Sequence, residues 1–281
     1  MIAELAARGR YHFTTAEFKA ALGSSDAAAR QSLSRLAGKG RIASPARGFY
    51  VVLPPEYRRL GCLPPDQFIP ALMEHRRTPY YVGLLSAAQY HGAAHHRPQE
   101  FQVVLERNRP PIVCGSVKVA FVARRNVGAV AVQSFNTPRG TARVSTAEAT
   151  AIDLVGYMYR SGGLDRVAGV LSELVEVLDA AKLVGAAKCS SIHWAQRLGY
   201  LLELVGGAGK VAELKDYVRH TGRNYTRLLP SSPAEDAPRS KAWRLHVNAT
   251  VVPDASFHAT SSASGELERL GSRTSKLNRT W

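Results

Sequence analysis

The chain begins with short helical segments separated by glycine and serine, and this pattern restricts its fold more than any other feature. Residues 1–7 predict a first helix. The threonine pair Thr14-Thr15 precedes a helical segment that stops at Gly23, and Ser24-Ser25 precede another that runs to about Ala37. Serine and threonine favour the start of a helix because their side-chain oxygen accepts a free backbone N–H. Glycine favours its end because it adopts a left-handed conformation. The spacing predicts two helices joined by a tight turn.

The second of these helices has an apolar and a polar side. Ala29, Leu33 and Leu36 recur at intervals of four and three, as the buried side of a helix does. The opposite side carries arginine, glutamine and serine. In a DNA major groove, arginine bonds guanine through two hydrogen bonds and glutamine does the same with adenine. The helix therefore has the composition of one that reads bases.

Two short β-rich segments follow, residues 41–43 and 48–52, on either side of Ser44-Pro45-Ala46-Arg47. They predict a hairpin, or wing, so that residues 1–53 form a winged helix-turn-helix. Bases would be read from the helix, while Lys39, Arg41 and Arg47 would reach phosphates or the minor groove. The predicted DNA-binding residues are Ser25, Arg30, Gln31, Ser34, Arg35, Lys39, Arg41 and Arg47. The alternative is a small helical bundle with a solvated basic face.

The whole chain is basic, with 37 Lys and Arg against 22 Asp and Glu and a formal charge of +15. Residues 1–50 contain eight basic and three acidic residues. A field of this sign attracts polyanions, either nucleic acid or an anionic membrane surface. One helix-turn-helix contacts half a site, so useful specificity requires two half-sites, bound by a dimer or by two copies in tandem, and both arrangements stay open.

The length of 281 residues suggests about two domains. Paired prolines mark residues 54–65 as a linker, and residues 66–254 form the second domain. Residues 100–105, 117–123 and 127–135 predict strands, four helices follow over 146–159, 164–178, 191–205 and 211–221, and 243–252 predicts a last strand. The expected class is α+β, a winged helix-turn-helix followed by a small sheet and a helical bundle. Residues 255–281 hold nine Ser or Thr among 27 residues, and we expect a disordered tail.

The sequence predicts a cytoplasmic protein. No apolar run is long enough to span a bilayer, and the N-terminus lacks the basic and apolar regions of a signal peptide. Cys62, Cys114 and Cys189 are far apart and odd in number, which supports neither a disulfide framework nor a zinc ribbon.

No catalytic constellation is apparent. His91, His95 and His96 are the most metal-like cluster, but no cysteine or carboxylate completes it, and they fit better at the packed end of a helix. A nuclease would need carboxylates with a nearby lysine, and neither Glu100 with Glu106 nor Glu148 with Asp153 has a usable spacing. The motifs of serine hydrolases and phosphate-binding loops are missing. We therefore expect no enzyme activity, no metal and no cofactor.

The second domain has basic residues of its own, several of them in predicted loops or at strand ends: Arg76, Arg77, Arg107, Arg109, Arg124, Arg125, Arg139 and Arg143. Three interpretations stay open. They form a solvated surface, a further nucleic-acid contact, or a contact for an acidic protein partner.

Several ordered segments of the chain resemble the AbiEi family, the antitoxins of abortive-infection toxin–antitoxin systems. They are residues 81–105, 143–155, 162–165, 196–203 and 243–248. The resemblance covers about residues 1–254. It implies an N-terminal winged helix that binds inverted repeats and represses its own operon. It also implies a C-terminal domain that counteracts a nucleotidyltransferase-type toxin, directly or indirectly, and no catalytic residues. The rival functions are a regulator whose second domain senses a ligand and a DNA-targeted nuclease.

Overall fold

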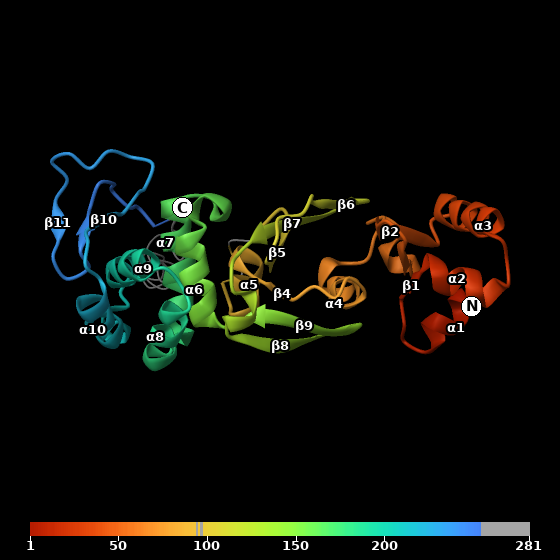
Figure 1. Cartoon of the computed structure of the whole chain (residues 1–281), viewed down its shortest axis with the longest axis horizontal. Coiled ribbons are helices and arrows are strands. Elements are labelled where there is room, and N and C mark those ends of the chain that lie inside the picture. Colours follow the sequence, from red (N-terminus) through yellow and green to blue (C-terminus); the bar gives the residue numbers. More distant parts are fainter. Residues whose placement is uncertain (94, 96–97, 254–281) are drawn as a thin grey trace, which may run out of the picture.

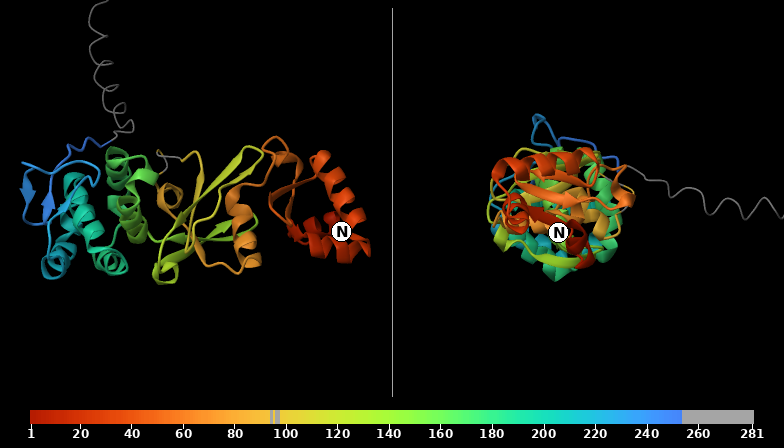
Figure 2. Two further views of the ribbon diagram at one scale, coloured as in Figure 1. Left: turned by 45° about the horizontal axis from the view of Figure 1, so that its top comes forward. Right: turned by 90° about the vertical axis from the view of Figure 1, so that its right-hand side faces the viewer.

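The computed structural model describes residues 1–93, 95 and 98–253. The predicted tail, residues 255–281, lies outside the described residues. The described chain is elongated, with the N-terminal helices at one end, a sheet in the middle, and a helical bundle followed by a small sheet at the other end (Figures 1 and 2). Helices and sheets are segregated along the molecule, which confirms the α+β class.

The N-terminal unit is a winged helix-turn-helix. Its elements are α1 (Ile2–Ala7), β1 (His12–Thr14), α2 (Thr15–Leu22), α3 (Asp26–Gly38), β2 (Ile42–Ala46) and β3 (Phe49–Val52). The strands form an antiparallel sheet in the order β1-β3-β2. Phe13, Phe18, Ala29, Leu33 and Ile42 are buried between this sheet and the helices.

The wing differs from its prediction in length. Strand β2 continues through Pro45 to Ala46, with an irregular register between Ala43 and Ala46, so that the turn contains only Arg47 and Gly48. Proline donates no backbone hydrogen bond and is tolerated in a strand at such an irregularity. Gly48 has φ of +73°, which glycine adopts readily.

The wing sheet is covered on both faces. Alternate residues of β3 point to opposite sides: Val52 packs on the helices, whereas Phe49 and Val51 join a hydrophobic cluster with Leu63 and Phe68 of the following segment. The predicted linker, residues 54–65, contains the 3-10 turn η1 (Pro55–Tyr57), and a second 3-10 turn, η2 (Pro65–Gln67), begins at its last residue. The wing is therefore packed against the middle of the molecule.

A single arginine strengthens this contact. Arg139 lies in the turn between β8 and β9, with its guanidinium 3.9 Å from the ring centroid of Tyr11. It also donates to Gln67 at 2.5 Å and pairs with Glu56 at 3.5 Å. The side chain thus connects the N-terminal unit, the connecting segment and the sheet.

The middle of the molecule is a mixed six-stranded sheet. Its strands are β4 (Tyr80–Val82), β5 (Phe101–Leu105), β6 (Ile112–Cys114), β7 (Val117–Ala123), β8 (Val132–Thr137) and β9 (Gly140–Ser145), in the order β6-β7-β5-β4-β9-β8. The pairs β5–β7 and β4–β9 are parallel. Helices α4 (Ile69–His75) and α5 (Leu84–Tyr90) pack beside it.

Beyond the sheet lies the helical bundle, which consists of α6 (Ala147–Gly156), α7 (Leu164–Leu174), α8 (Ala180–Lys188), α9 (Ile192–Leu204) and α10 (Ala212–Thr221). The 3-10 turns η3 (Val127–Ala129), η4 (Met158–Ser161), η5 (Val175–Val177) and η6 (Ala208–Lys210) lie between the longer elements. One hydrophobic core runs from the sheet through the bundle to the C-terminal segment.

The predicted strand over residues 243–252 was wrong in extent. Only Leu245–His246 form a strand, β12, which pairs with β10 (Thr226–Arg227) and β11 (Arg239–Ser240). Trp243 is fully buried instead, and its indole N–H donates to Glu203 at 2.6 Å. The apolar residue at 243 thus anchors the small sheet to the bundle.

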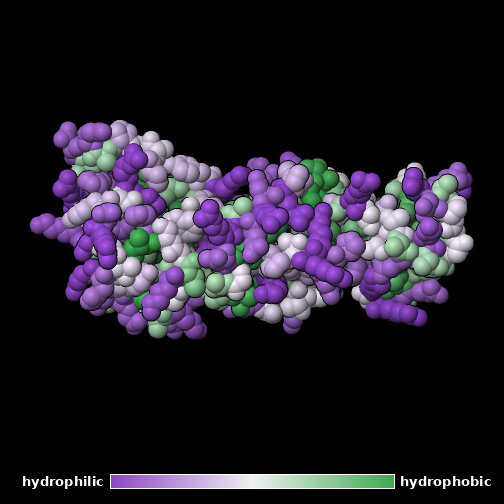
Figure 3. Space-filling model, in the orientation of Figure 1, coloured by the Kyte–Doolittle hydropathy of each residue, from purple (hydrophilic) through white to green (hydrophobic). Residues whose placement is uncertain are grey.

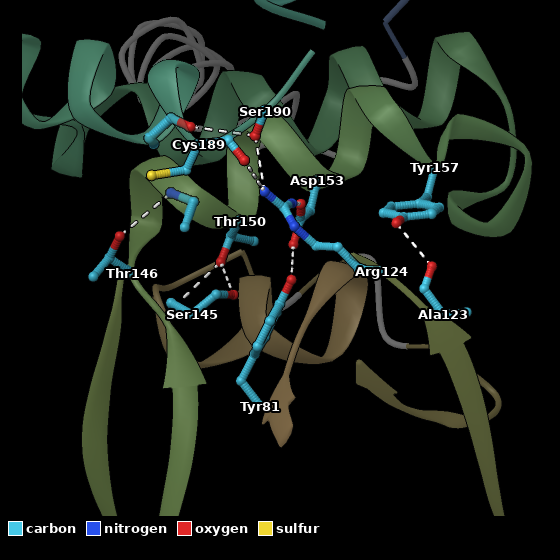
Figure 4. A network of polar contacts seen from close by, with 12 residues as sticks. Tyr81, Ala123, Arg124, Ser145, Thr146, Thr150, Asp153, Tyr157, Cys189 and Ser190 are labelled. Atoms are coloured by element: carbon cyan, nitrogen blue, oxygen red, sulfur yellow. Dashed lines mark hydrogen bonds and ion pairs between the residues drawn. The ribbon is translucent and has the colours of Figure 1, made fainter. Parts of the chain in front are cut away.

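A buried polar network joins the sheet to the bundle (Figure 4). Arg124, just after β7, pairs with Asp153 of α6, and the Tyr81 hydroxyl donates to the same carboxylate at 2.6 Å. Arg124 also donates to the carbonyl of Cys189 at 3.0 Å and to the Ser190 hydroxyl at 2.9 Å. The arginine and the aspartate are 7% and 0% exposed.

Candidate nucleic-acid interface

Local hydrogen bonds fix the start of each helix in the helix-turn-helix. Thr14 and Glu17 form a capping box: the Glu17 N–H donates to the Thr14 hydroxyl at 3.2 Å, and the Glu17 carboxylate accepts from the Thr14 N–H at 2.7 Å. Ser25 caps α3 through the Ala28 N–H at 3.3 Å. Gly23 adopts φ of +57° between the two helices. The angle between α2 and α3 therefore rests on residue types that are visible in the sequence.

The acidic residues of this unit are paired with cations away from the outer face of α3. Lys19 of α2 pairs with Asp26 of α3 at 2.6 Å, which lowers the pKa of Asp26. Burial acts to raise the pKa of Glu17, but hydrogen bonds from Arg10, at 2.5 Å, and from Thr14 outweigh it, so that the net shift is downward. Both carboxylates consequently stay charged. Asp26 neutralises Lys19 on α2, and Glu17 neutralises Arg10, which precedes β1.

The structure places every predicted contact residue at the surface. Ser25, Arg30, Gln31, Ser34, Arg35, Lys39, Arg41 and Arg47 are all exposed. In the part of the chain that the structure describes, the five cationic side chains among them form no ion pair and no hydrogen bond. Their charge is therefore available to an external anion.

The outer face of α3 has a small, polar centre. With about 3.6 residues per turn, Gln31 and Ser34 point away from the buried stripe, and Arg30 and Arg35 lie on either side of them. Ala27 and Gly38 share the centre of this face and are exposed. Sequence reasoning missed these two residues, although the same periodicity reveals them. Small side chains here allow the backbone to approach a groove.

The charge continues past the end of α3. Lys39 follows the helix, Arg41 precedes β2, and Arg47 occupies the two-residue turn of the wing. The Ser44 hydroxyl donates to the carbonyl of Ala46 at 3.0 Å, within the same hairpin. The recognition helix and the wing tip are thus held on one unit, whose other side is packed on the middle sheet.

The histidines singled out by the sequence have separate partners. His91 shares a hydrogen bond of 2.7 Å with the carbonyl of Ser145, and burial lowers its pKa. His95 pairs with Glu173 at 3.3 Å, and His96 lies outside the described residues. No group of three or more histidine, cysteine or acidic side chains within residues 1–93, 95 and 98–253 is arranged to hold a metal.

The carboxylates considered for a nuclease have structural contacts or lie apart. Asp153 is engaged by Arg124 and Tyr81, and Glu148 accepts the backbone N–H of Asp179 at 3.0 Å. Glu100 and Glu106 are exposed at the two ends of β5. The sheet does not bring these four together.

Two family models match the chain. Residues 1–52 match the one described as "Transcriptional regulator, AbiEi antitoxin", and residues 81–204 match "AbiEi antitoxin C-terminal domain". The chain belongs to the AbiEi family. As a member, it is a DNA-binding regulator of a toxin–antitoxin system. The first match contains the helix-turn-helix and the wing, and the second contains the sheet together with α6 to α9.

Among solved structures, the AbiEi fold seen here is similar to "Crystal structure of RV2827C protein from Mycobacterium tuberculosis". The TM-score is 0.64, with 17% sequence identity over 87% of this chain and 88% of that chain. At this identity the likeness concerns the fold. The curated proteins gave no match.

The surface shows where contacts to other molecules are available. Within the described residues, no helix has the length and apolar character needed to cross a membrane. On the face in Figure 3, hydrophobic residues are scattered among hydrophilic ones rather than gathered in a continuous belt. The clearest feature for recognition is therefore the group of exposed cations on and around α3, which form no ion pair with another described residue.

Proposed function

We propose that this protein is an antitoxin that binds inverted repeats in its own promoter, represses its operon and counteracts a nucleotidyltransferase-type toxin. The observation that supports DNA binding best is the outer face of α3, where Gln31 and Ser34 lie between two arginines that have no partner among the described residues. Residues 1–53 act as the DNA-binding domain and 66–254 as the antitoxin domain, joined by 54–65. Such a protein works in the cytoplasm, where its promoter is.

In this proposal the eight exposed residues divide into two groups. Arg30, Gln31, Ser34 and Arg35 contact base edges, because they lie on the outward face of the helix. Lys39, Arg41 and Arg47 contact phosphates, and Ser25 contacts the backbone near the helix N-terminus. Two copies, as a dimer or as a cooperative pair, occupy the two half-sites.

The antitoxin role is assigned to the sheet and the bundle, since the second family match lies there. No reaction is part of the proposal: the protein acts by binding, without a catalytic residue, a metal or a cofactor. The carboxylates that a nuclease would use are separated or have structural partners.

The first test is a gel-shift titration with the protein's own promoter and a scrambled duplex at about 150 mM salt. Salt matters because phosphate neutralisation alone makes any basic protein bind DNA. A preference of at least about 100-fold for the promoter, with stepwise complexes, supports the repressor role. Equal binding to both duplexes contradicts it.

The antitoxin role is tested by co-expression. Cells that produce the neighbouring toxin should grow when the full chain is supplied, and a variant with Gln31→Ala and Arg35→Ala, supplied from an unrelated promoter, should rescue equally well. Rescue by neither protein contradicts the antitoxin assignment. The absence of a toxin gene beside this one would instead favour a regulator whose second domain senses a ligand.

A further inference from the structure

A hollow of about 590 Å³ opens where the sheet meets the helical bundle. It lies between the segment after β7, the end of α6 and the turn from α8 to α9. Figure 4 shows part of its wall, with Arg124 between the ring of Tyr157 and the turn that carries Cys189 and Ser190. The lining residues come from three separate segments: 124–126 with Ala129, Tyr157, and 188–191 with Trp194. Its volume is in the range of small-molecule sites.

Among the described residues, the lining is positively charged and contains no carboxylate. Arg125 and Lys188 are exposed, and neither forms an ion pair with another described residue. The floor is Arg124, whose charge is balanced by Asp153, a fully buried residue. The N-terminus of α9, capped by Ser191, adds a partial positive charge at the same wall. This excess of positive charge suits an anion such as a phosphate group.

One wall is aromatic. The rings of Tyr157 and Trp194 lie edge to face, with centroids 5.2 Å apart. The Tyr157 hydroxyl donates to the carbonyl of Ala123 at 2.9 Å, which orients that ring. Trp194 is only partly buried, and it packs against Gly156, where a Cβ atom would lie 2.4 Å from the indole. The Arg124 guanidinium lies over the indole, 5.5 Å from the ring centroid. The part of Trp194 that stays exposed can contact a flat ring, as aromatic side chains do with nucleobases.

We propose that the hollow binds a nucleotide unit, with its phosphate at Arg125 and Lys188 and its base against Trp194. A small inorganic anion would make no use of the aromatic wall, and an uncharged ring compound would make no use of the cations, whereas a nucleotide contacts both. The unit is either a free mononucleotide or the terminal nucleotide of a single strand. The site is separate from α3, so this proposal stands independently of the DNA-binding one.

Calorimetric titration of the full chain with AMP, GMP, CMP and UMP tests the proposal, with inorganic phosphate and the matching nucleosides as further probes. At least one nucleotide should bind with a Kd below about 1 mM. Removing both charges in Arg125→Met/Lys188→Met should weaken binding at least about tenfold, and Trp194→Leu about fivefold or more. Arg223→Met serves as the matched control: Arg223 is an exposed cation that follows α10 and is not among the residues that line the hollow, so the affinity should change by less than about twofold.

Two probes distinguish the sources of the nucleotide. A single-stranded octanucleotide with a terminal phosphate should bind more tightly than the mononucleotide if the site holds a strand end, and less tightly if it holds a free nucleotide. The proposal is overturned if no mononucleotide or octanucleotide saturates the protein up to about 5 mM. It is equally overturned if phosphate binds as well as every nucleotide, or if the double charge variant binds as the wild type does. Because both charged residues are exposed, that variant keeps the test valid even if Trp194→Leu unfolds.

Discussion

Replacing Arg124 with methionine should destabilise the protein more than any other exchange of a basic residue that we consider. The substitution keeps most of the side-chain volume and removes the charge. Asp153, with no exposed surface, would then keep the Tyr81 hydroxyl as its hydrogen-bond donor. The carbonyl of Cys189 and the hydroxyl of Ser190 would also lose a donor.

The magnitude follows from the burial of the pair. Leaving one partner of a buried ion pair without the other costs about 3–5 kcal/mol. Domains are stable by about 5–15 kcal/mol, so the loss is a large fraction of the total. Replacing both partners, as in Arg124→Met/Asp153→Leu, should restore most of the lost free energy of unfolding, because two apolar side chains leave no buried charge.

Urea unfolding followed by circular dichroism measures these free energies, with equal m-values as the sign that the same structure unfolds. Arg125→Met is the matched control. Its side chain is exposed and forms no ion pair within the described chain, so the change should stay within about 0.5 kcal/mol. A loss below about 1 kcal/mol for Arg124→Met, or a double variant less stable than the single one, would refute the reasoning.

Three further predictions concern other parts of the molecule. Gly199→Ala should destabilise the protein by about 1–3 kcal/mol in the same urea assay, because the added Cβ would lie 2.0 Å from the buried Trp243 ring. Gly185 is an exposed helical residue with no atom within 4 Å of a Cβ added there, so Gly185→Ala should be neutral or stabilising. The pKa of Glu17 is lower in the folded protein than its unfolded value, near 4.5. The ionised carboxylate therefore stabilises the fold above pH 4.5, and this stabilisation is lost as the pH falls through the folded pKa. The melting temperature of Glu17→Gln should fall less than that of the wild type between about pH 7 and pH 3, and an equal fall would contradict this. Lys39→Ala should reduce the slope of log affinity against log salt by about 1 on promoter and scrambled DNA alike, whereas an unchanged slope would remove Lys39 from the phosphate contacts.

The sequence predicted best what local chemistry determines. The limits of α2 and α3 follow from Thr14, Gly23 and Ser25, which act within one helical turn. Strands β1, β4 and β6 were missed, because three residues are too few to show an alternating pattern. Strand β9 and helix α8 were also missed, and the strand predicted over residues 127–135 is η3 followed by the first part of β8. The wing turn was predicted too long because Pro45, a residue typical of turns, lies in β2.

Long-range pairing was beyond sequence reasoning. In the sequence Arg124 is one of several basic residues, but its partner Asp153 is 29 positions away on another element, and neither residue's neighbours indicate the pair. The nucleotide-sized hollow is similar, since its cations and its aromatic wall come from three segments. On α3, by contrast, one short helix carries all the base-reading candidates, so its periodicity alone brought them together.

The most direct test of the central claim is hydroxyl-radical footprinting of the protein's own promoter, with the wild type and with Gln31→Ala/Ser34→Ala. We predict protection of two half-sites related by an inverted repeat, about one helical turn apart or a multiple of it. The α3 variant should lose this protection at the same protein concentration while still binding weakly to any duplex. Protection that is absent, or that the variant preserves unchanged, would contradict the assignment of α3 as the helix that reads DNA.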